Sequence, residues 1–297
     1  MARMCTLILG VDVVAPASVL LAANRDEDPG RPADPPGVLS ESPRLVGGRD
    51  RRAGGTWLAV RERRAVVALL NRRDHSGEPA PPVPGRRSRG ALVLDVASAA
   101  EDEPPPRLPA DPPGVLRGPG PTGSSLALAA LRRAMASCLL SRYSPCSLVF
   151  ASPEASWWMA LEGDAPPWCR GRPRTPRFHA IAPGWHVLTH ADLDDPGEPR
   201  TARLVRELAG FAPGSLAEAQ ERLDALLASH GDEARGLPPV CLHHGGMVTV
   251  SSSRVWLAAG DARYRHAEGR PCEHPLEDVS GLLEPANLGS RSANRPR

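Results

Sequence analysis

Cys5 and the tetrapeptide Asn24-Arg25-Asp26-Glu27 are the residues of this chain whose types and spacing suggest catalysis. A thiol near the amino terminus is a candidate nucleophile, and a charged cluster at the end of an apolar run is a candidate for activating it. An arginine near the sulfur would favour the thiolate, and an aspartate could orient an amine by hydrogen bonding. Arg25 and Asp26 are the candidates for these two roles.

The position of Cys5 suggests that its own α-amine could serve as the base. Removal of the preceding residues would leave a thiol of pKa about 8.5 and an amine of pKa about 7.7 to 8.0 on one residue, so the amine could accept the thiol proton near neutral pH. Excision of Met1 alone would leave Ala2-Arg3-Met4 ahead of Cys5. We therefore expect either translation from Met4 or trimming of the leader.

The composition excludes several enzyme classes, because all 36 cationic side chains are arginine and lysine is absent. Schiff-base chemistry, a pyridoxal phosphate linkage and a Walker-type phosphate loop each need a lysine ammonium group. A net charge of only +2 argues against nucleic-acid binding despite the many arginines.

The cysteines indicate reduced thiols, since those at 5, 138, 146, 169, 241 and 272 form neither a Cys-x-x-Cys pair nor a compact secreted framework. Residues 1–23 make a poor signal peptide because Asp12 and Pro16 interrupt the apolar stretch. No later run approaches the ~20 apolar residues of a membrane-spanning helix. We expect a cytoplasmic protein without stable membrane insertion.

The apolar patterns predict an α+β fold with antiparallel sheets. Strand pairs are expected near both ends of the chain and helices mostly between them. The predicted strands cover residues 5–14, 18–24, 56–60, 65–70, 146–152, 156–162, 185–189, 248–259 and 262–268, and the predicted helices cover 88–100, 124–142, 200–211 and a segment opening at the capping box 215–218. We expect one domain over residues 1–297, with a Pro/Gly-rich insertion near 101–123 and a flexible tail near 286–297.

Four separated motifs, in order and with matching spacing, resemble the NRDE family, also called transport and Golgi organisation protein 2. They are Met4-Cys5-Thr6-Leu7, the segment Ala22 to Glu27, Gly54-Gly55-Thr56-Trp57-Leu58 and Ser88-Arg89-Gly90, and later segments such as Gly269-Arg270-Pro271-Cys272 continue the likeness. The family in turn looks like the N-terminal nucleophile (Ntn) cysteine hydrolases that act on bile salts and penicillins. The resemblance thus implies a four-layer αββα sandwich of two stacked antiparallel sheets.

The resemblance also implies roles for individual residues. Cys5 would be the nucleophile, Arg25 and Asp26 its activating neighbours, and Asn71 an oxyanion donor. Asn24, Glu27, Trp57 and His190 would support the site, although relatives have an asparagine where this chain has His190. Because adjacent side chains of a strand point to opposite faces, Arg25 and Asp26 cannot both face the sulfur automatically.

Two functions remain open at this point. The first is hydrolysis of an amide or thioester in a small acylated molecule through an acyl-Cys5 intermediate, without a cofactor. The second, implied by eukaryotic relatives, is non-catalytic binding or trafficking of haem or of an acyl-CoA or other lipid in haem or lipid homeostasis. The oligomeric state is undetermined.

Each signal also has a purely structural interpretation. Cys5 could be a small core residue, the charged tetrapeptide an ion-pair network, Asn71 a turn residue and Trp57 part of the core. His186 and His190 lie about 13 Å apart on an extended strand, too far to share a metal. Cys241, His243 and His244 could bind metal or haem, but Gly245-Gly246 suggests a loop, so no metal site is expected.

Overall fold

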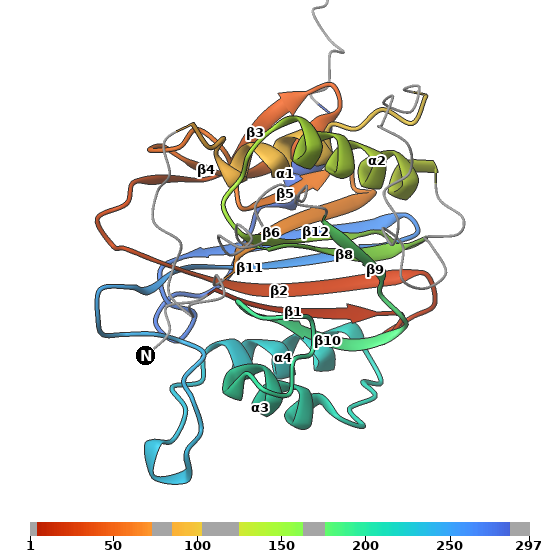
Figure 1. Ribbon diagram of the computed structural model, residues 1–297. Coiled ribbons are helices and arrows are strands. Elements are labelled where there is room, and N and C mark those ends of the chain that lie inside the picture. The colour runs from red at the N-terminus through yellow and green to blue at the C-terminus, as the bar shows by residue number, and fades with distance from the viewer. Residues whose placement is uncertain (1–4, 73–84, 103–124, 163–175, 286–297) are drawn as a thin grey trace, which may run out of the picture.

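The computed structural model describes residues 5–72, 85–102, 125–162 and 176–285. Most of the expected insertion near 101–123 and the expected tail at 286–297 lie outside these residues. Within them, two antiparallel sheets are stacked face to face, with one pair of helices on each outer face (Figure 1).

The first sheet contains the first and the last strands of the described chain. Its strands, in spatial order, are β10 (Gly184–Leu188), β1 (Thr6–Val11), β2 (Ser18–Glu27), β11 (Val248–Ala258), β12 (Asp261–Glu268) and the short β13 (Glu277–Asp278). The register pairs Thr6 with Asn24, and Ser252 pairs with Asn24 from the other side. A β-bulge between Thr249 and Ser251 shifts the register opposite Arg25 and Asp26. Irregular pairing thus coincides with the charged tetrapeptide.

The strands of the second sheet follow one another in sequence order, with α1 and α2 inserted between β6 and β7. Its strands, in spatial order, are β3 (Ala33–Glu41), β4 (Arg44–Asp50), β5 (Leu58–Arg61), β6 (Ala65–Asn71), β7 (Cys146–Ala151), β8 (Ser156–Leu161) and β9 (Arg177–Ala180). The sequence patterns did not predict β3, β4 or β9. The outer strand β3 contains Pro35 and Pro36, which are tolerated at a sheet edge because they donate no ladder hydrogen bond.

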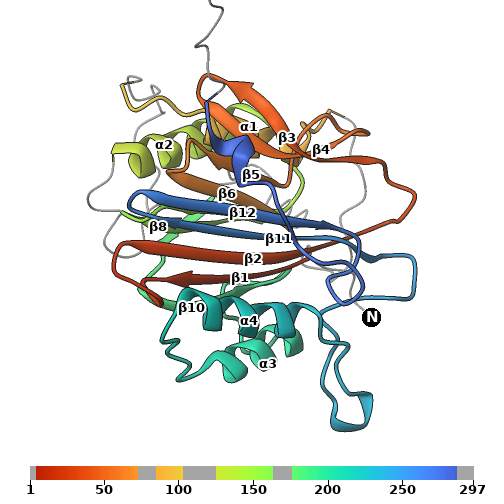
Figure 2. The same cartoon turned by 180° about the vertical axis from the view of Figure 1, so that it is seen from behind.

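The helices cover the outer faces of the two sheets (Figures 1 and 2). They are α1 (Arg89–Ala97), α2 (Ser125–Leu140), α3 (Pro199–Leu208) and α4 (Leu216–Leu227), with short 3₁₀ turns at Glu233–Arg235 and Ser280–Leu283. Helices α1 and α2 lie over the second sheet, and α3 and α4 lie over the first. Ser215 caps α4 by accepting a hydrogen bond from the Glu218 amide, as the capping box predicts.

Alternating side chains divide the apolar residues into three cores. Leu21 on β2 faces the other sheet, whereas Leu20 beside it faces α3 and α4. Trp157 and Trp158 on β8 likewise point to opposite faces, as predicted. The expected αββα sandwich is confirmed, and no helix among the described residues is long and apolar enough to span a membrane.

Candidate active site

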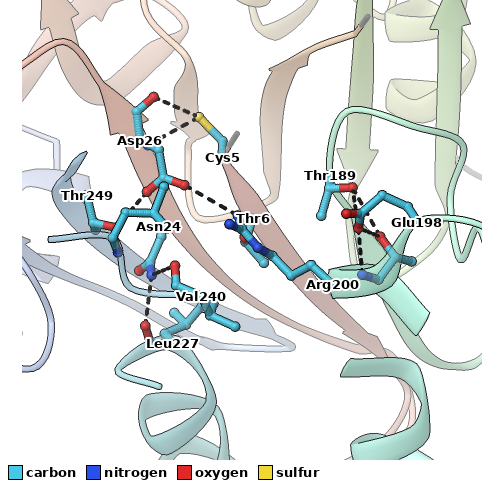
Figure 3. A network of polar contacts seen from close by, with 12 residues as sticks. Cys5, Thr6, Asn24, Asp26, Thr189, Glu198, Arg200, Leu227, Val240 and Thr249 are labelled. Carbon is cyan, nitrogen blue, oxygen red and sulfur yellow. Dashed lines mark hydrogen bonds and ion pairs between the residues drawn. The ribbon is translucent and has the colours of Figure 1, made fainter. Parts of the chain in front are cut away.

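Cys5 lies immediately before β1, at the edge of the layer between the two sheets. Its sulfur accepts a hydrogen bond from the Asp26 backbone N–H at 3.4 Å and lies 3.7 Å from the Asp26 carbonyl oxygen (Figure 3). The side chain is half-buried against the inter-sheet core, as is that of Trp57. The β1–β2 pairing thus places the thiol against the backbone of the NRDE segment.

The strand geometry of β2 divides the NRDE side chains between two faces. Arg25 and Glu27 continue the series of Leu21 and Ala23, which face the inter-sheet layer where Cys5 packs. The Arg25 and Glu27 side chains form an ion pair at 3.8 Å. Asn24 and Asp26 continue the opposite series and face α3 and α4. The side chains of Arg25 and Asp26 therefore lie on opposite faces of β2, as strand alternation predicts.

The Asp26 carboxylate is directed away from the thiol (Figure 3). Thr249 donates a hydrogen bond to one carboxylate oxygen at 2.6 Å, and an Arg200 nitrogen lies 3.6 Å from the other. Arg200 also donates to the Thr6 hydroxyl at 3.0 Å. Burial raises the pKa of Asp26 to about 7, although Thr249 and Arg200 oppose the shift. Asp26 contacts Cys5 through its backbone and anchors α3 through its side chain.

Asn24 has an anchoring position on the same face. Its amide nitrogen donates to the Leu227 carbonyl at 2.9 Å and to the Val240 carbonyl at 3.2 Å. Leu227 ends α4, and Val240 belongs to the segment that leads to β11. The first residue of the NRDE motif therefore holds distant backbone segments against the sheet.

The surroundings of Cys5 keep its thiol protonated. Burial raises the pKa of Cys5 to about 12, and the negative charge of Asp26 adds to the increase. The Asp26 backbone hydrogen bond and the positive charge of Arg25 act in the opposite direction. Since a thiolate is the reactive species, the cysteine needs a base before it can attack.

Arg89 is a partly buried cation that interacts electrostatically with Cys5, and the sequence reasoning did not single it out by itself. It opens α1, where burial lowers its pKa and the nearby Cys146, Glu27 and Cys5 oppose that shift. Its guanidinium donates to the Pro145 carbonyl at 3.2 Å. The available signal was its place in the Ser88-Arg89-Gly90 motif.

Two motif glycines explain how Arg89 reaches this position. A β-carbon on Gly55 would lie 2.4 Å from the Gly90 carbonyl carbon, and one on Gly90 would lie 2.8 Å from the Thr56 nitrogen. Only glycine permits this backbone contact, through which the Thr56 N–H donates to the Gly90 carbonyl at 3.3 Å. The contact holds the start of α1 next to the start of β5.

Asn71 and His190 are the other residues that the sequence predicts for the site. Asn71 ends β6, is exposed and pairs with Cys146 on β7. Its alternation with Leu70, which faces the inter-sheet core, assigns Asn71 to the α1 side of the sheet. His190 follows β10, and its charge helps to lower the pKa of Glu198, the N-cap of α3. The structure thus joins Cys5 to Arg25, Glu27 and the Asp26 backbone.

Possible metal ligands lie outside this site. His230, Cys241, His243 and Cys272 offer ligand atoms within 4.8 Å of one another. The sequence interpretation considered Cys241 and His243 with His244, and it did not connect them to His230 or Cys272. Cys272 is 29 residues from His243 along the chain, so no local sequence pattern connects the two.

The two stacked antiparallel sheets, with helices on both outer faces and Cys5 just before an inner strand, form the αββα sandwich that the resemblance implies. Residues 4–107 match the family described as Transport and Golgi organisation 2, which confirms the resemblance to the NRDE family. No curated protein matches the chain.

Several solved structures are similar to this chain at low sequence identity. An N-acylethanolamine-hydrolyzing acid amidase ortholog of Caenorhabditis elegans is 12% identical with a TM-score of 0.48, over 84% of this chain and 92% of that one. A variant of conjugated bile acid hydrolase from Clostridium perfringens is 12% identical with a TM-score of 0.46, over 94% of each chain. Penicillin V acylase from Agrobacterium tumefaciens is 14% identical with a TM-score of 0.46, over 89% of this chain and 83% of that one.

Proposed function

We propose that this protein is a cysteine hydrolase of the Ntn type that cleaves an amide or thioester of a small acylated molecule. The observation that carries the proposal is the position of the Cys5 sulfur at the edge of the inter-sheet layer, within 3.4 Å of the Asp26 amide nitrogen. Arg25 lies on the same face of β2, and its charge lowers the thiol pKa. Cys5 is therefore the nucleophile of the proposed reaction.

The proposed activation needs removal of the residues before Cys5. With these residues in place, burial keeps the pKa of the thiol at about 12, and no side chain among the described residues forms a hydrogen bond with the sulfur. A free α-amine on Cys5 would supply the missing base at the same residue. This amine, rather than the Asp26 carboxylate, accepts the thiol proton in the proposed mechanism.

The reaction then follows acyl transfer through a covalent intermediate. The Cys5 thiolate attacks the acyl carbon, a new carbon–sulfur bond forms, and the bond from that carbon to the leaving nitrogen or sulfur breaks. The α-ammonium group returns its proton to the leaving group. Water next attacks the acyl-cysteine, gives a proton to the α-amine and releases the carboxylic acid, while the amine returns that proton to the sulfur.

The charges near the thiol favour the transition state of this reaction. Arg25 and Arg89 supply positive charge near Cys5, where negative charge develops on the acyl oxygen. Asn71 remains the predicted amide donor to that oxygen, and such a donor contributes about 3 kcal/mol. Strand alternation directs Asn71 to the α1 side of its sheet, so its side chain would have to turn toward the sulfur to reach that oxygen.

The amino terminus and the reactivity of the thiol test the proposal together. The protein from its native host is analysed by intact mass and amino-terminal sequencing, and it is then treated with a thiol-directed acyl probe. Active protein is expected to begin at Cys5 and to carry the probe there. Active protein that retains Ala2, or an unlabelled terminal Cys5, would contradict the proposed chemistry.

A non-catalytic binding protein for small acylated ligands is the second candidate function. The orientation of the Asp26 carboxylate favours it, because that group is committed to Thr249 and Arg200 instead of the thiol region. For such a protein, Cys5→Ala keeps the ligand affinity. For the hydrolase, the same change removes turnover.

A further inference from the structure

Two cysteines and two histidines meet outside the β-sandwich. His230, Cys241 and His243 belong to the segment between α4 and β11, and Cys272 belongs to the turn after β12. The α4–β11 segment projects from the sandwich in both views (Figures 1 and 2). The cluster therefore joins two connections that are far apart in the sequence.

The distances within the cluster are close to those of a tetrahedral site for one metal ion, since all four ligand atoms lie within 4.8 Å of one another. The sulfurs of Cys241 and Cys272 are 3.5 Å apart, and the His243 Nε2 atom lies 3.1 Å from Cys272 and 3.8 Å from Cys241. Zinc bonds of about 2.3 Å to sulfur and about 2.0–2.1 Å to nitrogen would separate such ligands by roughly 3.3–3.8 Å. A disulfide would need sulfurs about 2.05 Å apart.

The orientation of His243 also fits metal ligation. Its Nδ1 atom lies 3.5 Å from a Glu273 carboxylate oxygen, and its Nε2 atom faces the sulfurs. Arg270 donates to the other Glu273 oxygen at 2.7 Å. A carboxylate behind a histidine ligand fixes the ring and makes the coordinating nitrogen a better donor.

Backbone hydrogen bonds position both sulfurs. The Val240 and Cys241 amides donate to the Ser229 carbonyl, each at 2.9 Å. On the other connection, the Glu273 and His274 amides donate to the Arg270 carbonyl and close a turn around Cys272. The packing of His230 against His243, with ring centroids 4.6 Å apart, completes the group.

We propose that His230, Cys241, His243 and Cys272 bind one Zn²⁺ ion in a structural site. On binding, each thiol releases one proton to solvent, and the two thiolates balance the charge of the ion. Two sulfur and two nitrogen ligands are typical of structural zinc, and four protein ligands leave no position for a substrate.

The zinc site would stabilise the chain segment that contacts β2 behind the candidate active site. The Leu242 amide, next to Cys241, donates to the Thr249 hydroxyl at 2.9 Å, and that hydroxyl donates to Asp26. The carbonyl of Val240, on the other side of Cys241, accepts from Asn24. The metal thus fixes the segment that contacts both polar residues on the outer face of β2.

Metal analysis of the full chain, purified without a polyhistidine tag, tests the proposal. We expect one zinc per chain after dialysis, and we expect the cobalt-substituted protein to show thiolate-to-cobalt charge transfer and tetrahedral d–d bands. Cys272→Ser and His243→Ala should lose the metal. The matched neighbours His274→Ala and His244→Ala should retain it.

A measurement on the wild-type protein covers the case in which the ligand variants fail to fold. Cys241 and Cys272 should resist alkylation in the zinc-loaded protein and react after chelation, while Cys138 should show no such change. The proposal is overturned if zinc added to reduced protein gives neither stoichiometric binding nor thiol protection. A Cys241–Cys272 disulfide in protein whose thiols are blocked at lysis would overturn it as well.

Discussion

Cys5 and Cys241 are both free cysteines, but different partners surround the two sulfurs. Cys5 contacts one backbone amide, and arginines supply the nearby positive charge. Cys241 faces a second thiol and an imidazole within 3.8 Å. A lone thiol near cations suits nucleophilic attack, whereas paired thiols with imidazoles suit a metal. The neighbours, rather than the cysteine itself, determine the chemistry.

Thr249 connects the region around Cys5 with the region around Cys241. Its hydroxyl accepts from the Leu242 amide beside the thiol–imidazole cluster and donates to Asp26, whose amide contacts Cys5. The bulge at Thr249 and Ser251 places this hydroxyl opposite Asp26. Substitutions near Cys5 and substitutions near Cys241 can therefore test the proposed catalysis and the proposed metal binding separately.

Cys5→Ala should give the largest effect and should affect only one of the two regions. We expect turnover of a panel of acyl p-nitroanilides and acyl thioesters to fall by about 10³-fold or more, because Cys5 forms the acyl intermediate in the proposed mechanism. Zinc content should not change. Cys272→Ser should give the reverse pattern, with the metal lost and Cys5 still labelled by the acyl probe.

Two results for Cys5→Ala would contradict this expectation. Retained ligand affinity together with no wild-type turnover on the panel would identify a binding protein. Loss of zinc in this variant would show that the two sulfur sites are not separable.

Asn71→Ala should have the next largest effect. If its amide stabilises the acyl oxyanion, kcat should fall by about 10²–10³-fold. The free energy of unfolding should change by less than about 0.5 kcal/mol, because the side chain is exposed. Steady-state kinetics and urea unfolding separate the two effects. An unchanged kcat would show that Asn71 does not stabilise the oxyanion. Arg89 would then be the next candidate for that role.

The layered fold followed from the sequence more closely than the site did. Apolar runs and turn residues predicted most strands and all four helices, because alternation and capping are local signals. Strand β3 was missed because Pro35, Pro36 and Gly37 oppose the usual strand composition, and sheet pairing outweighs that preference.

The site depended on information that local patterns do not contain. The sequence identified Cys5 and the NRDE segment, and strand alternation anticipated that Arg25 and Asp26 would diverge. The partners of Asp26 come from Thr249 and Arg200, which are distant in the chain. Cys272 lies 3.5 Å from Cys241 only because β12 returns the chain to that place.

Thr249→Val tests the connection between the two regions. The change keeps the shape of the side chain but removes one donor and one acceptor, which leaves the Leu242 amide and an Asp26 oxygen without that partner. We expect a loss of about 1–3 kcal/mol in the free energy of unfolding. Thr249→Ser keeps the hydroxyl and is the matched control. Equal urea unfolding of the two variants would show that the hydroxyl does not couple the regions.

Asp26→Asn should produce a change that is visible only as a function of pH. Burial raises the pKa of Asp26 from 3.8 to about 7, so between these values the folded protein retains a proton that the unfolded chain has released. The free energy of unfolding should therefore decrease as the pH rises from about 4 to about 7, by at most about 1.4 kcal/mol per pH unit from this group. Asparagine does not titrate, so this component should disappear.

Urea unfolding at a series of pH values, with Glu27→Gln as the control, distinguishes the two faces of β2. Glu27 faces the inter-sheet layer, so its variant should keep the Asp26 component of the slope. If Asp26→Asn keeps that slope as well, the carboxylate is ionised at an ordinary pKa in the folded protein. It would then carry negative charge throughout the range in which Cys5 must lose its proton, and the charge of Arg25 would have to offset it.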